Sequence, residues 1–333
     1  MTKQPLQKLF DAMYHGKHNF EDFLHSPMSQ NYEAIKLTPS SKRKILKPKE
    51  ILKVYHKFLS LFIFDYLPIN ERVVFSYRKG FSAFHAVEKH RNNRYFFQTD
   101  IKSFFGSIDG SLIRSAILSG ANSSPVSDIL QHSDRIIELV CVDNSLPVGF
   151  PSSAPLSNVA LFKFDNEMES FCNEQELTYS RYADDIIISG NKKGDTFAIE
   201  NLVQDNLLKY ASRKLKINYA KTRHFQTGGK VKILGMMILP NGKVSAETRR
   251  KKELEVLIHF YITSPVKFNE IISKIKAKSG KSVNLIEGDG LDVLSGSLNY
   301  IDSIDPDYTN KLRRKYGVTT IDMLMYRGFS KRS

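Results

Sequence analysis

Two adjacent acidic residues inside a strand-forming segment constrain this chain more than any other feature. Asp184 and Asp185 follow Tyr182 and Ala183 and precede three consecutive isoleucines. Aromatic and β-branched residues on both sides of this short interruption predict a β-hairpin over residues 179–190, with the acids at its tip. Adjacent carboxylates repel each other, and neighbouring buried strands add a desolvation cost, which a bound divalent cation offsets.

A third carboxylate ends another predicted strand. Residues 95–101 are rich in aromatic and β-branched side chains, and Asp100 lies near their end. If this strand and the hairpin are neighbours in one sheet, three carboxylates meet at one place. Oxygen ligands favour Mg²⁺ or Mn²⁺ over Zn²⁺, and two such ions stabilise the attacking and leaving oxygens of a phosphoryl transfer. An isolated Asp-Asp pair is usually a solvated turn, but the flanking strands and Asp100 favour a metal site.

The composition limits the partners and the location of the protein. Of 333 residues, 41% are hydrophobic, which is enough to bury a sizeable core. The chain has 49 Lys and Arg against 35 Asp and Glu, so its formal net charge of +14 indicates a polyanionic partner, either nucleic acid or anionic lipid. The N-terminus has no signal-peptide pattern, the longest apolar run (58–69) is too short to span a bilayer, and the two cysteines match no paired spacing. We therefore expect a cytoplasmic protein with no membrane partner.

The remaining pattern predicts an α+β fold in which a central mixed unit lies between two basic, largely helical flanks. The segment before residue 80 is Lys-rich and is predicted to be mainly helical. A turn is predicted at residues 240–242, where Pro, Asn and Gly follow one another. Helices are predicted over residues 51–62, 111–142, 155–173 and 195–215, and from residue 245 onward.

Five motifs, in order, resemble those of reverse transcriptases. One Asp-Asp box would be weak evidence, but an ordered set over about residues 40–300 is specific. The motifs are the Tyr-x-Asp-Asp box at 182–185, the first aspartate motif at 97–105, the segment Leu146-Pro147-Val148-Gly149-Phe150 with the residues up to Asn158, the lysine motif at 217–222, and the start of the primer grip at 233–235. The resemblance implies a right-hand polymerase with helical fingers, a ferredoxin-like palm with an antiparallel sheet, and a helical thumb.

The same resemblance divides the chain into three parts. The N-terminal region and fingers would occupy residues 1–93, and the palm residues 94–240 with a fingers insertion at about 106–145. The basic helical thumb would occupy residues 241–333. The implied activity is RNA-directed DNA polymerisation, in which dNTPs extend a hydroxyl primer.

The resemblance also assigns the catalytic residues. Asp100, Asp184 and Asp185 would hold two Mg²⁺ ions, with the carbonyl of Ile101 assisting and Mn²⁺ as a substitute. Lys221 would protonate or neutralise the pyrophosphate leaving group. A lysine beside a strand is as often part of the solvated surface, so the pattern leaves that alternative open.

Further residues are assigned to nucleotide and nucleic acid. Phe105 would be the steric gate that excludes a ribose 2′-hydroxyl, with an ordinary core phenylalanine as the alternative. Gly149 would let the backbone approach the nucleotide closely, although the segment could be only a turn. The nucleotide-binding set is Arg43, Arg78, Phe105, Gly149 and Tyr182. The nucleic-acid-binding set is Lys42, Lys79, Gly235, Arg249 and Arg250.

Two compact bacterial classes fit the length, which leaves little room for a ribonuclease H, integrase or endonuclease domain. These are the retron reverse transcriptases and the defence-associated "unknown group" enzymes. Retron enzymes carry an Asn-Ala-x-x-His motif, of which this chain keeps only His90. They also carry a Val-Thr-Gly motif, and this chain has Ile233-Leu234-Gly235 at that place. Val148 in place of the usual glutamine resembles the defence-associated group. The sequence therefore favours that group, and His90 is interpreted as structural.

The expected partners are an RNA template, a cognate non-coding RNA in this interpretation, the DNA product and dNTPs. A protein partner or a second copy of the chain is also expected, and antiphage defence is implied by the resemblance alone. Four alternatives stay open: a retron enzyme that makes branched RNA–DNA, a template-independent or protein-primed polymerase, a nucleotidyl cyclase on the same palm fold, and a nucleic-acid-binding scaffold without activity.

Overall fold

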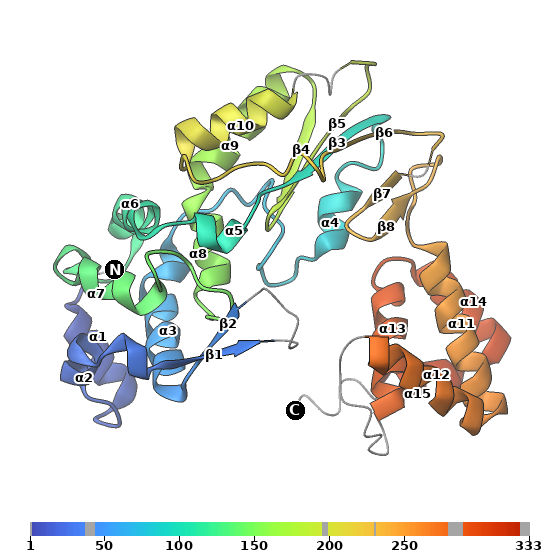
Figure 1. Cartoon of the computed structure of the whole chain (residues 1–333), viewed down its shortest axis with the longest axis horizontal. Coiled ribbons are helices and arrows are strands. Elements are labelled where there is room, and N and C mark those ends of the chain that lie inside the picture. The colour runs from blue at the N-terminus through green and yellow to red at the C-terminus, as the bar shows by residue number, and fades with distance from the viewer. Residues whose placement is uncertain (1, 37–43, 195–198, 230, 279–288, 327–333) are drawn as a thin grey trace. The chain divides into compact units, whose positions relative to one another are not determined.

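The structure, a computed structural model, describes residues 2–36, 44–194, 199–229, 231–278 and 289–326 (Figure 1). The chain separates into two compact units, Met1–Phe225 and Gln226–Ser333. Among the described residues, no helix has both the length and the apolar character needed to cross a membrane. Each unit is described by itself below.

The N-terminal part of the first unit is helical, as expected, except for one hairpin. Helix α3 (Glu50–Phe62) contains the predicted apolar stripe, and Leu52, Phe58 and Leu59 on it are fully buried. The short strands β1 and β2 pair in antiparallel register with Ile35 opposite Ile45, a hairpin that the Lys-rich pattern did not predict. The elements are α1 (Leu6–Tyr14), α2 (Phe20–His25), η1 (Met28–Gln30), β1 (Tyr32–Lys36), β2 (Lys44–Pro48), α3, η2 (Phe64–Tyr66) and α4 (Ala83–Glu88).

The two long helices predicted in the middle of the first unit are each divided. The first breaks at residues 121–128, because Pro125 lacks a backbone donor and holds Ser124 in an extended conformation. The second breaks at Leu161, whose backbone leaves the helical region. The resulting elements are α5 (Phe104–Ser107), α6 (Gly110–Gly120), η3 (Ala121–Ser123), α7 (Ile129–Val140), α8 (Ser153–Ala160) and α9 (Phe162–Glu174).

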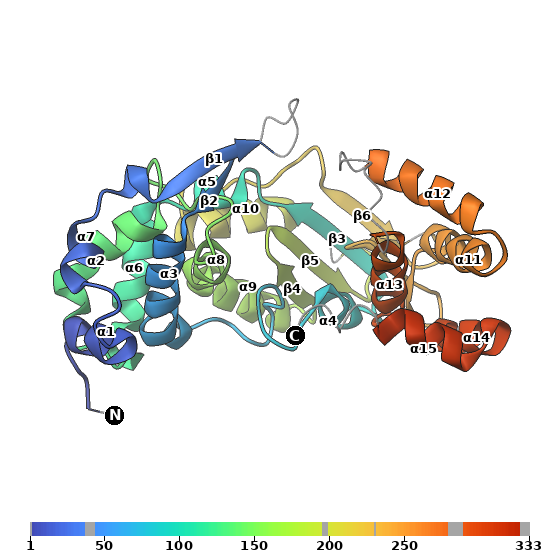
Figure 2. The same ribbon diagram turned by 90° about the horizontal axis from the view of Figure 1, so that it is seen from below.

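The central sheet of the first unit has the strand order β4-β5-β3-β6, and β5 pairs antiparallel with both β4 and β3. Helix α9 packs on β4, and α10 packs on α9 (Figures 1 and 2). Both sheet faces are covered along β5, since Ile186, Ile187 and Ile188 are all fully buried. The predicted strand and hairpin are therefore confirmed. The elements are β3 (Tyr95–Asp100), β4 (Thr178–Tyr182), β5 (Asp185–Gly190), α10 (Ile199–Tyr210) and β6 (Arg223–Gln226).

One hydrophobic core runs through the first unit. It joins Leu6 and Phe10 of α1 to Ile113 in the predicted insertion and to Ile186 and Ile217 beside the central sheet. The predicted fingers and palm thus share a continuous interior, and the boundary between them at residue 93 stays a prediction.

The second unit is a small sheet followed by helices. Strands β7, β8 and β9 form an antiparallel sheet in that order, and the predicted turn at 240–242 lies between β8 and β9, with Gly242 at a φ of 78°. Helix α11 packs on α12 and α13, and α13 also packs on α14 and α15. The predicted basic helical segment is therefore present. The elements are β7 (Val231–Ile233), β8 (Met236–Ile238), β9 (Val244–Ala246), α11 (Thr248–Thr263), α12 (Pro265–Lys278), α13 (Asp289–Asp302), α14 (Pro306–Tyr316) and α15 (Val318–Tyr326).

Candidate active site

Three carboxylates meet at one end of the central sheet. Asp100 ends β3 and Asp185 begins β5, and the antiparallel register places them directly opposite each other. Side chains in such a pair have Cβ atoms about 4.5–5.5 Å apart. Asp184 lies in the two-residue loop of the β4–β5 hairpin, closed by the pairing of Tyr182 with Asp185. The backbone N–H of Ile101 donates to the carbonyl of Asp184 at 3.0 Å, which ties the loop to the end of β3.

The electrostatics of these carboxylates favour a cation. Burial and the negative charge of Asp184 raise the pKa of Asp185 to about 6, and Asp100 adds to the repulsion. Asp100 is 8% exposed, and its Oδ1 atom is buried without a hydrogen-bond partner. Buried carboxylate oxygens without partners are costly, and a hard divalent ion accepts such oxygens as ligands. The donor set therefore fits Mg²⁺, although among the described residues no three such groups are already arranged as a metal cluster.

Lys221 partly compensates the negative charge. Its Nζ atom lies 3.2 Å from Oδ2 of Asp100, and the Nδ2 atom of Asn218 donates to the same oxygen at 3.3 Å. An antiparallel bridge between Ile101 and Ile217 brings this segment to the end of β3. The Lys221 side chain is 63% exposed, so the ion pair lies at the edge of the site, and a role at the leaving group stays a prediction. Asn218 was not predicted, since a lone amide carries no signal in the sequence.

Two aromatic rings, Phe105 and Tyr77, lie near each other, and Tyr77 is close enough to Asp184 to be affected by its charge. Phe105, in the short helix after β3, is partly exposed, and its ring centroid lies 6.4 Å from that of Tyr77. Tyr77 is 48% exposed and has a positive φ of 57°, which is uncommon for a residue with a side chain. Burial and the negative charge of Asp184 raise the pKa of Tyr77. Tyr77 was missed because the pattern drew attention only to the basic residues that follow it.

The structure gives Arg78 a bracing position. Its guanidinium donates to the carbonyls of Glu71 and Val74 at 2.7 Å each, pairs with the Glu71 carboxylate at 3.1 Å and covers the ring of Phe81 at 4.2 Å. These contacts hold the loop that carries Tyr77. Lys79 is exposed in the same loop. A nucleotide role for Arg78 and a nucleic-acid role for Lys79 stay predictions.

The close approach that requires a glycine at position 149 is made by strand β2. A Cβ atom on Gly149 would clash with the carbonyl oxygen of Leu46, and the N–H of Leu46 donates to the carbonyl of Val148 at 2.8 Å. This packing explains the glycine without a nucleotide, so the predicted nucleotide role stays a prediction. Lys42 and Arg43 lie outside the described residues.

The predicted residues of the second unit divide into two groups. Leu234 and Gly235 form the two-residue loop between β7 and β8, with φ values of 49° and 79°. A Cβ atom on Gly235 would lie 3.7 Å from the hydroxyl of Tyr300, and Arg250 covers the Tyr300 ring at 4.9 Å. Gly235 and Arg250 therefore gather around one tyrosine. Arg249 is exposed and pairs with Glu253 on its own helix at 2.8 Å.

His90 has the structural environment that the sequence suggested. Its ring bridges the hydroxyls of Ser189 and Ser180 at 2.6 and 2.7 Å. Burial lowers the pKa of His90 to about 3, so the ring is neutral at physiological pH. The histidine joins the segment after α4 to strands β4 and β5.

Comparison with known proteins identifies relatives of the whole chain. The chain is 25% identical over 314 residues to the retron Ec83 reverse transcriptase of Escherichia coli, covering 91% of this chain and 92% of the relative. It is 24% identical to the retron Ec73 reverse transcriptase of Escherichia coli, covering 82% and 83%. Against the retron Mx65 reverse transcriptase of Myxococcus xanthus, it is 24% identical, covering 80% and 60%.

Solved structures with a related arrangement include telomerase from Candida albicans in complex with a fragment of telomeric RNA, at 11% identity and a TM-score of 0.46, covering 97% of this chain and 69% of that chain. The foamy viral protease-reverse transcriptase in complex with double-stranded DNA matches at 12% identity and a TM-score of 0.41, covering 89% and 44%.

A family model described as reverse transcriptase (RNA-dependent DNA polymerase) matches residues 33–238. The matched segment contains Asp100, Asp184, Asp185 and Lys221, which the fold brings together at the end of the central sheet. It also contains the two strands and the hairpin that position these side chains. Because the match extends over more than half of its length, the chain belongs to the reverse transcriptase family and is an RNA-directed DNA polymerase with the α+β fold of that family.

Proposed function

We propose that this polymerase is a retron-type reverse transcriptase, which copies a cognate non-coding RNA into DNA by two-metal nucleotidyl transfer. The observation that carries the mechanism is the register that sets Asp100 opposite Asp185, with Asp184 in the adjoining loop. The relatives named above, which match between 80% and 91% of the chain at 24–25% identity, support the retron class. Val148 and the altered retron motifs favour the defence-associated group, which is the second candidate.

In the proposed site, the carboxylates of Asp100, Asp184 and Asp185 hold two Mg²⁺ ions with help from the carbonyl of Ile101, and Mn²⁺ can replace them. When bound, the ions supply activation of the attacking hydroxyl and neutralisation of the triphosphate charge. A pH of 7 is above the Asp185 pKa of about 6, so the carboxyl group is mainly ionised and available as a metal ligand. Lys221 turns from Asp100 to the pyrophosphate, where its ammonium group neutralises negative charge on this leaving group.

Nucleotide selection is proposed to take place at the rings beside the carboxylates. Phe105 excludes the ribose 2′-hydroxyl by its bulk, and Tyr182 lines the same position from the hairpin. The proposed phosphate contacts are Arg43 and Arg78, with Gly149 behind the nucleotide. Template and primer contacts are proposed at Lys42, Lys79, Gly235, Arg249 and Arg250. Phosphate contacts of this kind weaken as salt rises, because bound counterions are released when the protein binds.

The test is to express the protein from its native locus, to purify it, and to sequence the nucleic acid that copurifies. Asp185→Asn is prepared in parallel, with Asp205→Asn, an exposed position on α10, as the matched control. We expect one discrete RNA in all three samples and complementary DNA only in the wild type and the control. DNA joined to that RNA by a branch would support the retron class, and unbranched complementary DNA would support the defence-associated group.

Two results would overturn the proposal. DNA without a matching RNA would indicate template-independent or protein-primed synthesis. Absence of metal-dependent dNTP incorporation on an added RNA template and primer, in the wild type, would indicate a binding scaffold.

The biological role proposed for this activity is antiphage defence in the cytoplasm, where transcripts and dNTPs are available. A protein partner or a second copy of the chain is part of this proposal, because synthesis of DNA does not by itself stop a phage. Phage plating on cells with the native locus tests the role. We expect protection with the wild type and none with Asp185→Asn, and equal plating on both would remove the defence role while leaving the polymerase activity.

A further inference from the structure

The hairpin that carries the acids is supported from behind by a buried charge. Alternation along β4 and the register with β5 put Tyr182 on the sheet face of Asp185 and Asp100 and put Tyr179 and Arg181 on the opposite face. Arg181 is fully buried there. The helix α9 packs on this strand, so the charged group lies between the hairpin and the helix rather than in solvent.

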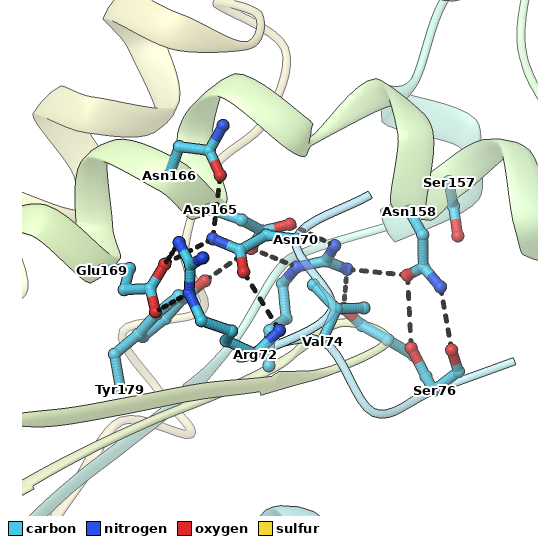
Figure 3. A network of polar contacts seen from close by, with 12 residues as sticks. Asn70, Arg72, Val74, Ser76, Ser157, Asn158, Asp165, Asn166, Glu169 and Tyr179 are labelled. Carbon is cyan, nitrogen blue, oxygen red and sulfur yellow. Dashed lines mark hydrogen bonds and ion pairs between the residues drawn. The ribbon is translucent and has the colours of Figure 1, made fainter. Parts of the chain in front are cut away.

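Asp165 on α9 is the partner of this arginine. The Nε atom of Arg181 donates to Oδ1 of Asp165 at 2.8 Å, and Nη2 donates to Oδ2 at 2.6 Å. Both side chains are 0% exposed, and the hydroxyl of Tyr179 donates to the same carboxylate at 2.7 Å. Figure 3 shows Asp165 and Tyr179 in one connected polar network. Buried ion pairs contribute little net stability compared with apolar side chains of similar volume, so this pair calls for another explanation.

The remaining nitrogen of the guanidinium reaches the tip of the hairpin. Nη1 of Arg181 donates to the carbonyl of Ala183 at 3.0 Å. That carbonyl belongs to the peptide group that links Ala183 to Asp184. The hydrogen bond therefore fixes the orientation of this peptide plane, and with it the direction in which the backbone enters Asp184 and Asp185. Ala183 has a φ of 56°, a left-handed conformation that costs a residue with a side chain about 1–2 kcal/mol. The tip conformation therefore depends on this buried donor.

The same network extends to the loop that carries Tyr77. Nη1 of Arg181 also donates to Oδ1 of Asn158 at 3.3 Å, and Nδ2 of Asn158 donates to the carbonyl of Ser76 at 2.8 Å. Ser76 precedes Tyr77, whose ring stands beside Phe105. The backbone of Arg181 also bonds to this segment, through its N–H to Val73 and its carbonyl to the N–H of Phe75. One buried arginine thus contacts the tip of the acidic hairpin directly and is joined to the Tyr77 loop through Asn158 and through its own backbone.

Helix α9 holds the beginning of that loop as well. Arg72 pairs with the Glu169 carboxylate through two nitrogens at 2.8 Å each, and Asn70 donates to Glu169 at 2.7 Å (Figure 3). The helix is therefore the common support for the loop and for Arg181.

We propose that Arg181 and Asp165 are positioning residues for the polymerase reaction. The pair sets the Ala183–Asp184 peptide so that Asp184 and Asp185 present their carboxylates to the metal ions, and it keeps the Tyr77 loop in register with them. The inference rests on the proposed use of these acids as metal ligands. A displacement of about 1 Å at such a site costs on the order of a hundredfold in rate.

The test replaces the pair by apolar side chains of similar length, in the double variant Arg181→Met with Asp165→Leu. This change removes the donor to Ala183 without leaving an unpaired buried charge, which alone would destabilise the fold. The control is Arg135→Met with Glu138→Leu on α7, a second buried arginine, which pairs at 2.7 Å with the half-exposed Glu138 and also donates to the carbonyls of Phe23 and Ser26. Thermal unfolding, binding of an RNA template and primer, and the Mg²⁺ dependence of dNTP incorporation are measured for both.

We expect the Arg181 double variant to fold and bind template while kcat falls by about tenfold to a hundredfold. The Mg²⁺ concentration for half-maximal rate should rise several-fold, and the KM for dNTP should stay nearly constant. The control should lose stability only. A folded double variant with wild-type rate and Mg²⁺ dependence would overturn the proposal, as would a rate that only follows the folded fraction.

Two further variants keep the result interpretable. Arg181→Lys retains a charge beside Asp165, but its ammonium lacks the planar fork whose three nitrogens contact both carboxylate oxygens and the Ala183 carbonyl. It should therefore fold and show the same rise in Mg²⁺ requirement, even if the double variant does not fold. Asp185→Asn, measured in the same assays, distinguishes a failure of the proposed function from a failure of this inference. An active Asp185→Asn contradicts the proposed function, whereas an inactive Asp185→Asn with an unaffected Arg181 double variant contradicts this inference alone.

Discussion

Two hairpins of this molecule have loops of the same length and are held by different means. The β4–β5 loop consists of Ala183 and Asp184, and the β7–β8 loop consists of Leu234 and Gly235. In the second loop both residues have positive φ, and the glycine adopts its value at no steric cost, which is typical of a self-sufficient type I′ turn. In the first loop only Ala183 has a positive φ, and a buried guanidinium holds its carbonyl.

The difference separates local from tertiary control. Gly235 closes its turn through its own conformational freedom. The acidic loop is closed on one side by Arg181, a neighbour in sequence that Asp165 of α9 holds in place, and on the other side by the N–H of Ile101, which is distant in sequence. Such control puts carboxylates where the local sequence would not put them by itself, and strain of this kind is concentrated at functional sites.

The strongest test of this difference removes the charge of the first loop. For Asp184→Asn we expect a loss of DNA synthesis of about a thousandfold, since metal ligation supplies several kcal/mol of transition-state stabilisation. Template binding should be unchanged, as a filter-binding assay would show. Loss of binding and synthesis together would mean that the loop is structural, and the two hairpins would then differ only in their turn chemistry.

The acidic loop should also show itself in the pH dependence of stability without metal. Because the pKa of Asp185 is raised from 3.8 to about 6, the folded state holds a proton that the unfolded state has released. The contribution of Asp185 to stability should therefore fall by up to about 3 kcal/mol as pH rises from about 4 to 6 and level off above that, whereas the buried His90, with its lowered pKa, contributes with the opposite sign. Denaturant unfolding of the wild type and of Asp185→Asn in EDTA isolates the Asp185 contribution as the difference between the two.

Asp185→Asn should remove this contribution, so the variant should be more stable than the metal-free wild type at pH 7, and the difference should disappear toward pH 4. Added Mg²⁺ should stabilise the wild type more at pH 7 than at pH 5, because the ion binds the ionised carboxylate. If the stability of the wild type relative to Asp185→Asn rises between pH 4 and 6, the pKa of Asp185 is not raised by burial and repulsion as described above.

A third test addresses the ring beside the first loop. Phe105→Val should lower the discrimination between dNTP and rNTP by about tenfold or more, since the steric contact with a 2′-hydroxyl is lost. Single-nucleotide incorporation with each sugar measures the ratio. Leu208→Val, at an exposed position on α10, should leave it unchanged. If discrimination in Phe105→Val equals that of the wild type, the ring is an ordinary packing residue.

The smallest expected effects compare the turns directly. Gly235→Ala should destabilise the second unit by about 1–2 kcal/mol, because its left-handed φ is unfavourable for a side chain although an added Cβ would meet its neighbours only at ordinary contact distance. Ala183→Gly should change stability by less than about 1 kcal/mol, because relief of strain is offset by the freedom that glycine gains when unfolded. We expect a lower rate for Ala183→Gly, and no change in rate would weaken the link between tip conformation and activity.

Much of the acidic site follows from the sequence because its signals are local. The isoleucines after Asp185 and the aromatic residues before Asp100 specify strands whose ends meet. The stripe of α3 and the turn before Lys243 are equally local. What the sequence could not give are the contacts between distant residues.

Three features illustrate that limit. A charged residue in a strand is ordinarily expected at the surface, so the burial of Arg181 could be found only with its partner on α9 in view. The β1–β2 hairpin has short strands that contain several lysines, and such a sequence predicts a helical or solvated segment rather than a hairpin. The long helix expected after residue 111 ends because Pro125 outweighs the apolar periodicity around it.

The continuous core of the first unit has a consequence for how the enzyme unfolds and evolves. Because the interior runs from Leu6 to Ile217 as one cluster, the described residues of this unit show no seam along which a fingers module could be exchanged or melt separately. Denaturation of this unit should be one cooperative transition. Insertions that diversify such an enzyme are therefore best tolerated at exposed connections, such as the turns of the smaller sheet, rather than between the parts that hold the acids.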